Sequence, residues 1–168
     1  MQLEELFNYK NKLMEDLLTN ESIVHLIDED VNIEEAEKLA YTQVFPYEEV
    51  VETIERGKVF ICFDLDIQRS VGSAPARMLY EPVLYVWVFA HQSRMRLPGG
   101  GVRTDALCSE ICKVLNGSRK YGLGELNLYA VKRFAPLMDI HGKCMTFQAK
   151  DISKVYDPTR AIPDNRRE

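Results

Sequence analysis

Residues 59–67, with the sequence VFICFDLDI, alternate between two sets of side chains. One set is wholly apolar, while the other includes Asp64 and Asp66, which is typical of a strand with one face in a core. A second stretch, VLYVWVFA at residues 83–90, is apolar on both faces and rich in β-branched and aromatic residues. This stretch predicts a strand in the middle of the same sheet.

Helical patterns surround these strands along the chain. Apolar residues recur every three or four positions over residues 2–18, and shorter patterns follow over 23–27 and 33–39. A further helix is expected from Thr104 or Asp105 to about Leu115, closed by Asn116-Gly117. Two last strands are expected at about 126–134 and 143–151.

This order of elements excludes a doubly wound parallel sheet, because two hairpins are joined by one helical crossover. We predict an α+β fold in which N-terminal helices precede a mostly antiparallel four-stranded sheet with a helix packed on one face. One domain is expected over residues 1–152, with an acidic helical part (1–57) and a sheet with its crossover helix (58–152). An extended C-terminal arm is expected over residues 153–168.

The same periodicities predict the core and the loops. Truncation of Trp87 to alanine is expected to cost about 3–5 kcal/mol, as for a buried aromatic residue. The loops around Ser70–Pro82 and Pro98–Gly101 are expected to become ordered at contacts with neighbouring subunits. The side chains expected to be largely buried are Leu3, Leu6, Phe7, Met14, Ile61, Phe63, Tyr85, Trp87, Phe89, Leu107, Ile111, Leu128 and Met145.

Composition and charge narrow the class of protein. The chain has 168 residues, 46% of them hydrophobic, and its longest apolar run (83–90) is too short to cross a membrane. The acidic start MQLEEL is unlike a secretory signal peptide, so the four cysteines are expected to be reduced thiols in a cytosolic product. Residues 1–57 carry a net charge of −11 and residues 58–168 a net charge of +6. Such a division can steer one copy of the chain onto another.

Asp64 and Asp66 give the strongest indication of an enzyme. Two carboxylates two positions apart on a strand share a face, where they could hold Mg²⁺ or act as nucleophile and acid. The stretch resembles the strand-end motif of haloacid-dehalogenase-type phosphatases, but that fold needs a parallel sheet and later Lys and Asp motifs that are not evident here. A metal-dependent phosphoesterase using Asp64 and Asp66 is therefore an alternative rather than the preferred hypothesis.

Other patterns fall short of a recognisable site. Cys108 and Cys112 lack the Cys-x2-Cys spacing of structural zinc, and the glycines at 99–101 lack the Lys-Ser/Thr ending of a phosphate loop. We expect no metal, no cofactor and no sequence-specific nucleic-acid binding, although passing contact with DNA inside a larger channel is compatible with the basic residues. Those flanking the expected helix are Arg94, Arg96, Arg103, Lys113, Arg119 and Lys120.

Four stretches carry a resemblance to known sequences. They are YTQVFPY (41–47), FICFDLD (60–66), RLPGGGVRTD (96–105) and FQAKD (147–151). These look like segments of uncharacterised proteins from phages and prophages of Gram-positive bacteria. The order of elements over about 58–151 also resembles the tail-terminator and tail-completion proteins of tailed phages, which form a ring, typically hexameric, between tail tube and head.

The resemblance implies a structural virion protein without catalytic activity, assembled in the host bacterial cytoplasm. It implies a homo-oligomeric ring at the neck, contacting tail tube and sheath or connector proteins and no membrane. A loop with three arginines beside a glycine-rich hinge can reach a neighbour's acidic surface, so the candidate interface residues are Arg94, Arg96, Arg103, Gly99, Gly100 and Gly101. A small adaptor protein that binds through its acidic helices is a further alternative.

Overall fold

The alternating stretch at residues 59–67 forms part of a long hairpin in the computed structural model, which describes residues 4–48, 57–71 and 78–149. The hairpin consists of β2 (Val59–Val71) and β3 (Met78–His91), paired in antiparallel register from Val59–Ala90 to Val71–Met78. Much of the loop expected at 70–82 is therefore strand, because cross-strand pairing continues through it. Residues 72–77 lie outside the described part.

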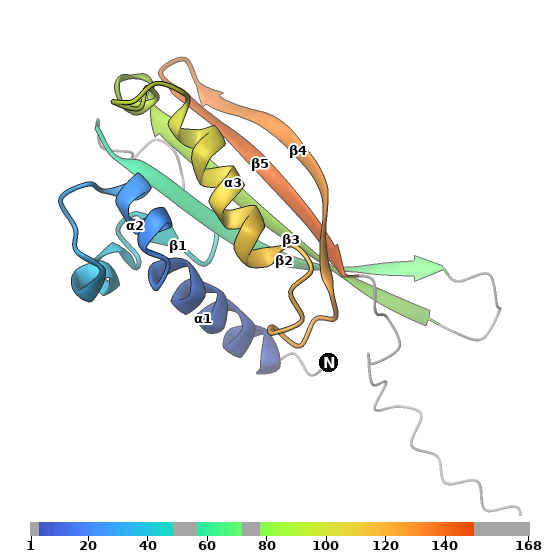
Figure 1. Cartoon of the computed structure of the whole chain (residues 1–168). Helices are drawn as coiled ribbons and strands as arrows, with labels where there is room; N and C mark the ends of the chain where they lie inside the picture. Colours follow the sequence, from blue (N-terminus) through green and yellow to red (C-terminus); the bar gives the residue numbers. More distant parts are fainter. Residues whose placement is uncertain (1–3, 49–56, 72–77, 150–168) are drawn as a thin grey trace, which may run out of the picture.

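The sheet has five strands in the order β1-β2-β3-β5-β4 (Figure 1). β4 (Leu126–Leu137) and β5 (Ile140–Ala149) form a second antiparallel hairpin, and β5 pairs with β3. β1 (Val44–Phe45) pairs in parallel with β2. The α+β prediction is confirmed, but the sheet is mixed and five-stranded, since a two-residue strand is too short to show alternation.

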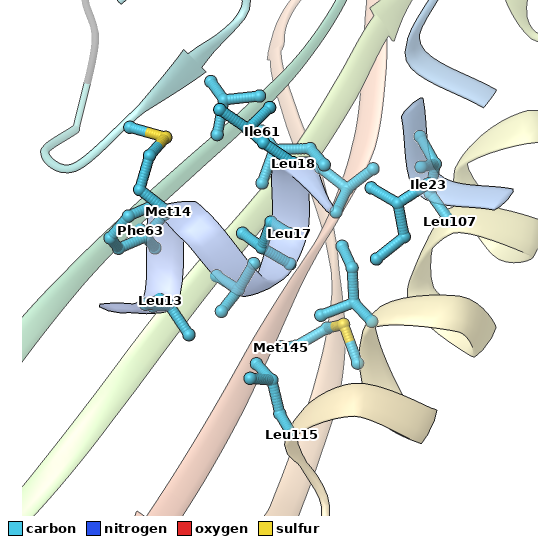
Figure 2. Close-up of a cluster of buried hydrophobic side chains, with 14 of the residues drawn as sticks. Leu13, Met14, Leu17, Leu18, Ile23, Ile61, Phe63, Leu107, Leu115 and Met145 are labelled. Carbon is cyan, nitrogen blue, oxygen red and sulfur yellow. The ribbon is translucent and has the colours of Figure 1, made fainter. Parts of the chain in front are cut away.

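Helices cover one face of the sheet (Figure 1). They are α1 (Glu4–Leu18), α2 (Glu21–Ile27) and α3 (Arg103–Leu115). The chain also forms two 3₁₀ helices, η1 (Ile33–Leu39) and η3 (Gln92–Arg94). Figure 2 shows Leu13 and Leu17 of α1, with Leu115 of α3, gathered over sheet residues such as Phe63 and Met145. This layer forms the main hydrophobic core.

The other face of the sheet carries a row of aromatic rings. Phe60 of β2 stacks on Phe89 of β3 with ring centroids 5.6 Å apart, and Phe89 contacts Phe134 of β4 at 5.6 Å. Gly142 of β5 lies between Phe89 and Phe134 in the strand register. Phe45 of β1 extends the row at 6.4 Å from Phe60, so this short strand also contributes to the second face.

Trp87 lies on this second face rather than in the helix-covered core. It is half-buried and stacks on Tyr85, which is also half-buried, with ring centroids 5.8 Å apart. The expectation that both are largely buried is met only in part, because a strand that is apolar on both faces does not reveal which face the helices cover. Truncation of Trp87 should therefore cost less than the about 3–5 kcal/mol of a fully buried aromatic.

Two other core expectations are wrong. Phe7 is 70% exposed on α1, and Leu128 is 36% exposed on β4, which lies at the sheet edge where half of the usual neighbours are missing. Leu3 and the side chain of Leu6 lie outside the described part. The expected core residues that are buried are Met14, Ile61, Phe63, Phe89, Leu107, Ile111 and Met145.

The boundaries of the expected helix at 104–115 need one adjustment. α3 begins at Arg103 after an N-cap at Val102, whose side chain has no oxygen to cap with, and Thr104 is buried instead. Its end matches the prediction, with Asn116 as C-cap and Gly117 at φ +78°. The expected arm at 153–168 lies outside the described residues. No helix within the described ranges is long and apolar enough to cross a membrane.

Candidate functional site

The arginine loop between β3 and α3 is folded by its own backbone. Arg96 and Val102 form an isolated antiparallel bridge, and the amide of Arg103 donates to the carbonyl of Met95 at 2.7 Å. Gly100 and Gly101 turn the chain with φ of +94° and +93°, a conformation that L side chains adopt only with strain. The loop expected to order on contact with a neighbour is thus already closed by internal hydrogen bonds.

Arg103 is buried and ties three segments together. Its Nε donates to the carbonyl of Arg94 at 2.8 Å, its Nη1 to that of Leu26 at 2.9 Å, and its Nη2 to Glu29 Oε1 at 2.5 Å. Only 2% of Arg103 is exposed. The guanidinium hydrogen bond and positive charge lower the pKa of Glu29. Arg103 therefore anchors the loop to the end of α2 and offers no free cation to a neighbouring subunit.

The three candidate arginines do come together around one small pocket. It has a volume of about 270 Å³, and Arg94 Nε is buried there with no hydrogen-bond partner in the described part of the chain. Arg96 is exposed on the rim of this pocket. Gly99, three positions further along the loop, has open space where a side chain would lie. The lining residues are Glu29, Ser93, Arg94, Arg96, Leu97, Pro98 and Arg103. A carboxylate brought in by another protein is the chemical group that such a rim would favour.

Asp64 and Asp66 share a face of β2, opposite Tyr85 and Val83 of β3, as their spacing predicts. The Lys10 ammonium lies 2.6 Å from Asp64 Oδ1, and the same oxygen accepts the amide hydrogen of Leu65 at 2.8 Å. Within residues 4–48, 57–71 and 78–149, no three His, Cys, Asp or Glu side chains are placed to hold a metal ion. Asp64 is thus engaged in an ion pair between sheet and helix.

The cysteines behave as packing residues. Burial raises the pKa of the Cys108 thiol to about 11, and burial also raises the pKa of Cys144. Because the thiolate is the nucleophilic form, both groups are weakly reactive at neutral pH. His91 accepts the amide hydrogen of Ser93 at 3.2 Å and serves as the N-cap of η3.

The basic residues at the far end of α3 are largely paired with acids. Lys113 lies 2.6 Å from Glu110, and Arg119 lies 2.6 Å from Glu125. Lys120 lies 3.4 Å from Asp16. These acidic neighbours partly offset the positive charge that would attract phosphate groups.

A second surface, along β4, is not evident from the sequence. This strand forms one edge of the sheet, and most of its side chains are exposed on both faces. A groove of about 560 Å³ runs between it and α3, lined by Asp105, Cys108, Ser109, Cys112, Lys113, Asn116, Leu128, Val131 and Met145. The sequence of this strand is the run LNLYAV at 126–131, followed by Lys132 and Arg133. By alternation alone, this pattern predicts an ordinary half-buried strand.

Comparison with known proteins identifies a family for this chain and a distant similarity to a solved structure. The model of a family described as YomW matches residues 3–149. A chain from the virion of a native gene transfer agent particle is 14% identical, over 64% of this chain and 77% of that chain, with a TM-score of 0.42. At that distance the structural similarity carries no functional information. No curated protein matches the sequence.

Proposed function

The chain belongs to the YomW family, which is of the phage and prophage type, and on that premise we propose that it is a structural protein of a phage or phage-like particle. In this role it forms a homo-oligomeric ring, typically hexameric, at the neck, as a tail terminator or a head–tail joining protein. Its partners are tail tube and sheath or connector proteins, with non-specific contact to DNA in the lumen. It acts in the virion through shape and charge, without catalysis.

The arginine loop is the observation that carries this proposal. A closed hairpin turn holds Arg96 exposed beside a small pocket, where Nε of Arg94 has no hydrogen-bond partner among the residues that the structure describes. Arg103 holds this rim through three hydrogen bonds, one of them to Leu26 of α2 and one to Glu29 just after that helix, so the cations are presented at little entropic cost. A rigid rim of this kind suits contact with an acidic surface of another virion subunit.

The charge of Arg96 should matter for particle assembly. We expect Arg96→Glu, introduced into the phage genome, to lower the yield of infectious particles about tenfold or more, because reversing an interface charge removes an ion pair and adds repulsion. Electron microscopy should show heads and tails that are not joined. Arg103 should be left intact in this test, because its substitution removes buried contacts.

The control is Lys12→Glu, a charge reversal at an exposed position of α1 away from the loop. It should leave the particle yield unchanged. Normal yield with Arg96→Glu would remove the loop from the interface. Purified protein that hydrolyses phosphoesters, and loses this activity in Asp64→Asn, would overturn the structural role and favour the enzyme.

A further inference from the structure

β4 has the properties of an interface strand that lacks its partner. Its outer edge pairs with no other strand in the described part of the chain, which leaves a row of backbone donors and acceptors open. Tyr129 is 70% exposed and Val131 is 45% exposed, so the open edge is also apolar. Long apolar edge strands are templates for pairing with another chain.

The groove between β4 and α3 extends this surface into the molecule. Leu128 and Val131 of β4 form one side, and Cys108 and Cys112 of α3 form the other, above Met145 of β5. An element that covers the edge of β4 can thus bury side chains in the groove as well. Burial of both the edge and the groove would add the apolar contact that a stable protein interface needs.

The charged side chains on β4 indicate which kind of partner surface this strand would bind. Lys132 and Arg133 are exposed on the strand, so we define the β4 surface as Tyr129, Val131, Lys132 and Arg133. Two β4 surfaces placed against each other would bring these cations together, which is destabilising. The expected partner is therefore an acidic surface rather than a second β4.

Such a surface lies on the other side of the same molecule. Exposed acids cluster on and just before η1 around Ile33, which is itself 40% exposed. η1 leads directly into β1, the strand at the opposite end of the sheet order from β4, and the pale-blue turn of η1 lies across the molecule from β4 in Figure 1. We define the η1 surface as Asp30, Ile33, Glu34, Glu35 and Glu37.

We propose that the β4 surface of one copy of the chain binds the η1 surface of the next copy. Each molecule then has one surface of each kind, on opposite sides, and the contact is head-to-tail. A repeated head-to-tail contact closes into a ring when its rotation allows. The inference rests on the proposed ring, but it concerns the contact between subunits and can fail while the virion role stands.

Two charge-reversal variants of the full chain test this contact. One is Lys132→Glu with Arg133→Glu on the β4 surface, and the other is Glu34→Lys with Glu37→Lys on the η1 surface. All four positions are exposed, and Glu35 is left unchanged because it pairs with Lys38 at 2.7 Å. Circular dichroism and thermal melting confirm that each variant is folded, and Lys12→Glu serves as a charge reversal elsewhere.

Sedimentation velocity and native mass spectrometry give the oligomeric state. The wild type and Lys12→Glu should form the same closed oligomer, while each double variant alone should be monomeric. An equimolar mixture of the two double variants should assemble beyond dimers, because the two intact surfaces are of opposite charge and so are the two reversed surfaces. A chain carrying all four substitutions should assemble again, since both charges are reversed together.

Other outcomes overturn the proposal in distinguishable ways. If the η1 variant assembles like the wild type while the β4 variant is monomeric, β4 binds a surface other than η1 and the proposed contact is wrong. If both variants assemble normally, the subunits use different surfaces, and the virion role is unaffected. A wild type that stays monomeric at all concentrations measured also rejects the contact.

Discussion

Replacing Gly142 with alanine should destabilise the protein by about 3 kcal/mol or more, the upper range for an added methyl group that a packed structure cannot accommodate. A Cβ at this position would lie 2.1 Å from the carbonyl oxygen of Val88, 2.6 Å from Phe89 Cβ and 2.8 Å from Phe89 Cα. Two of these atoms belong to the backbone of β3, so no side-chain rotation relieves the clash. β3 and β5 would have to separate where Phe89 and Phe134 meet across Gly142.

Denaturant unfolding followed by circular dichroism measures this cost. Gly99→Ala is the matched control, because a Cβ there meets nothing within 4 Å and the residue has no positive φ. We expect the control to change the free energy of unfolding by less than about 0.5 kcal/mol. A Gly142→Ala protein as stable as the control would contradict the close approach of β3 and β5.

Arg103→Met should destabilise the protein by about 2–4 kcal/mol, because methionine keeps much of the side-chain volume but leaves two carbonyls without their donor. The carbonyls belong to Leu26 and Arg94, at 2.9 Å and 2.8 Å from the guanidinium. The pKa of Glu29 should rise towards its ordinary value, because the guanidinium that lowers it is gone.

Chemical denaturation gives the stability change, and NMR titration of the Glu29 carboxyl gives the pKa change. Arg96→Met is the matched control, since this side chain is exposed and should leave both quantities nearly unchanged. Glu29→Gln should cost less than Arg103→Met, because the Glu29 carboxylate faces solvent. Wild-type stability in Arg103→Met would show that Arg103 does not anchor the loop.

The regular elements were predictable because local patterns determine them. The alternation at 59–67 and the glycine after Asn116 correspond to a strand and a helix end in the structure. β1 was missed because a two-residue strand forms only through its pairing with Ile61 and Cys62. The side on which Trp87 lies depends on where α1–α3 pack, which is a tertiary property that no local pattern in an apolar strand contains.

The position of the candidate site along the chain was predictable, but the different roles of its arginines were not. Arg96 and Arg103 look alike in sequence, being seven positions apart on the same loop. The structure separates them because Arg103 reaches Leu26, 77 positions away, while Arg96 remains exposed. The β4 surface was missed for a similar reason, since edge position follows from strand order rather than from the sequence of the strand itself.

Quantitative mass spectrometry of purified particles tests the virion role most directly. Particles of the phage or prophage that encodes the chain would be separated from host proteins on a density gradient, and the copy number of the chain measured against that of a capsid protein. We predict that the chain remains with the intact particles at a small and constant copy number per particle. Its absence from intact particles, with all of it recovered in the soluble host fraction, would contradict the account.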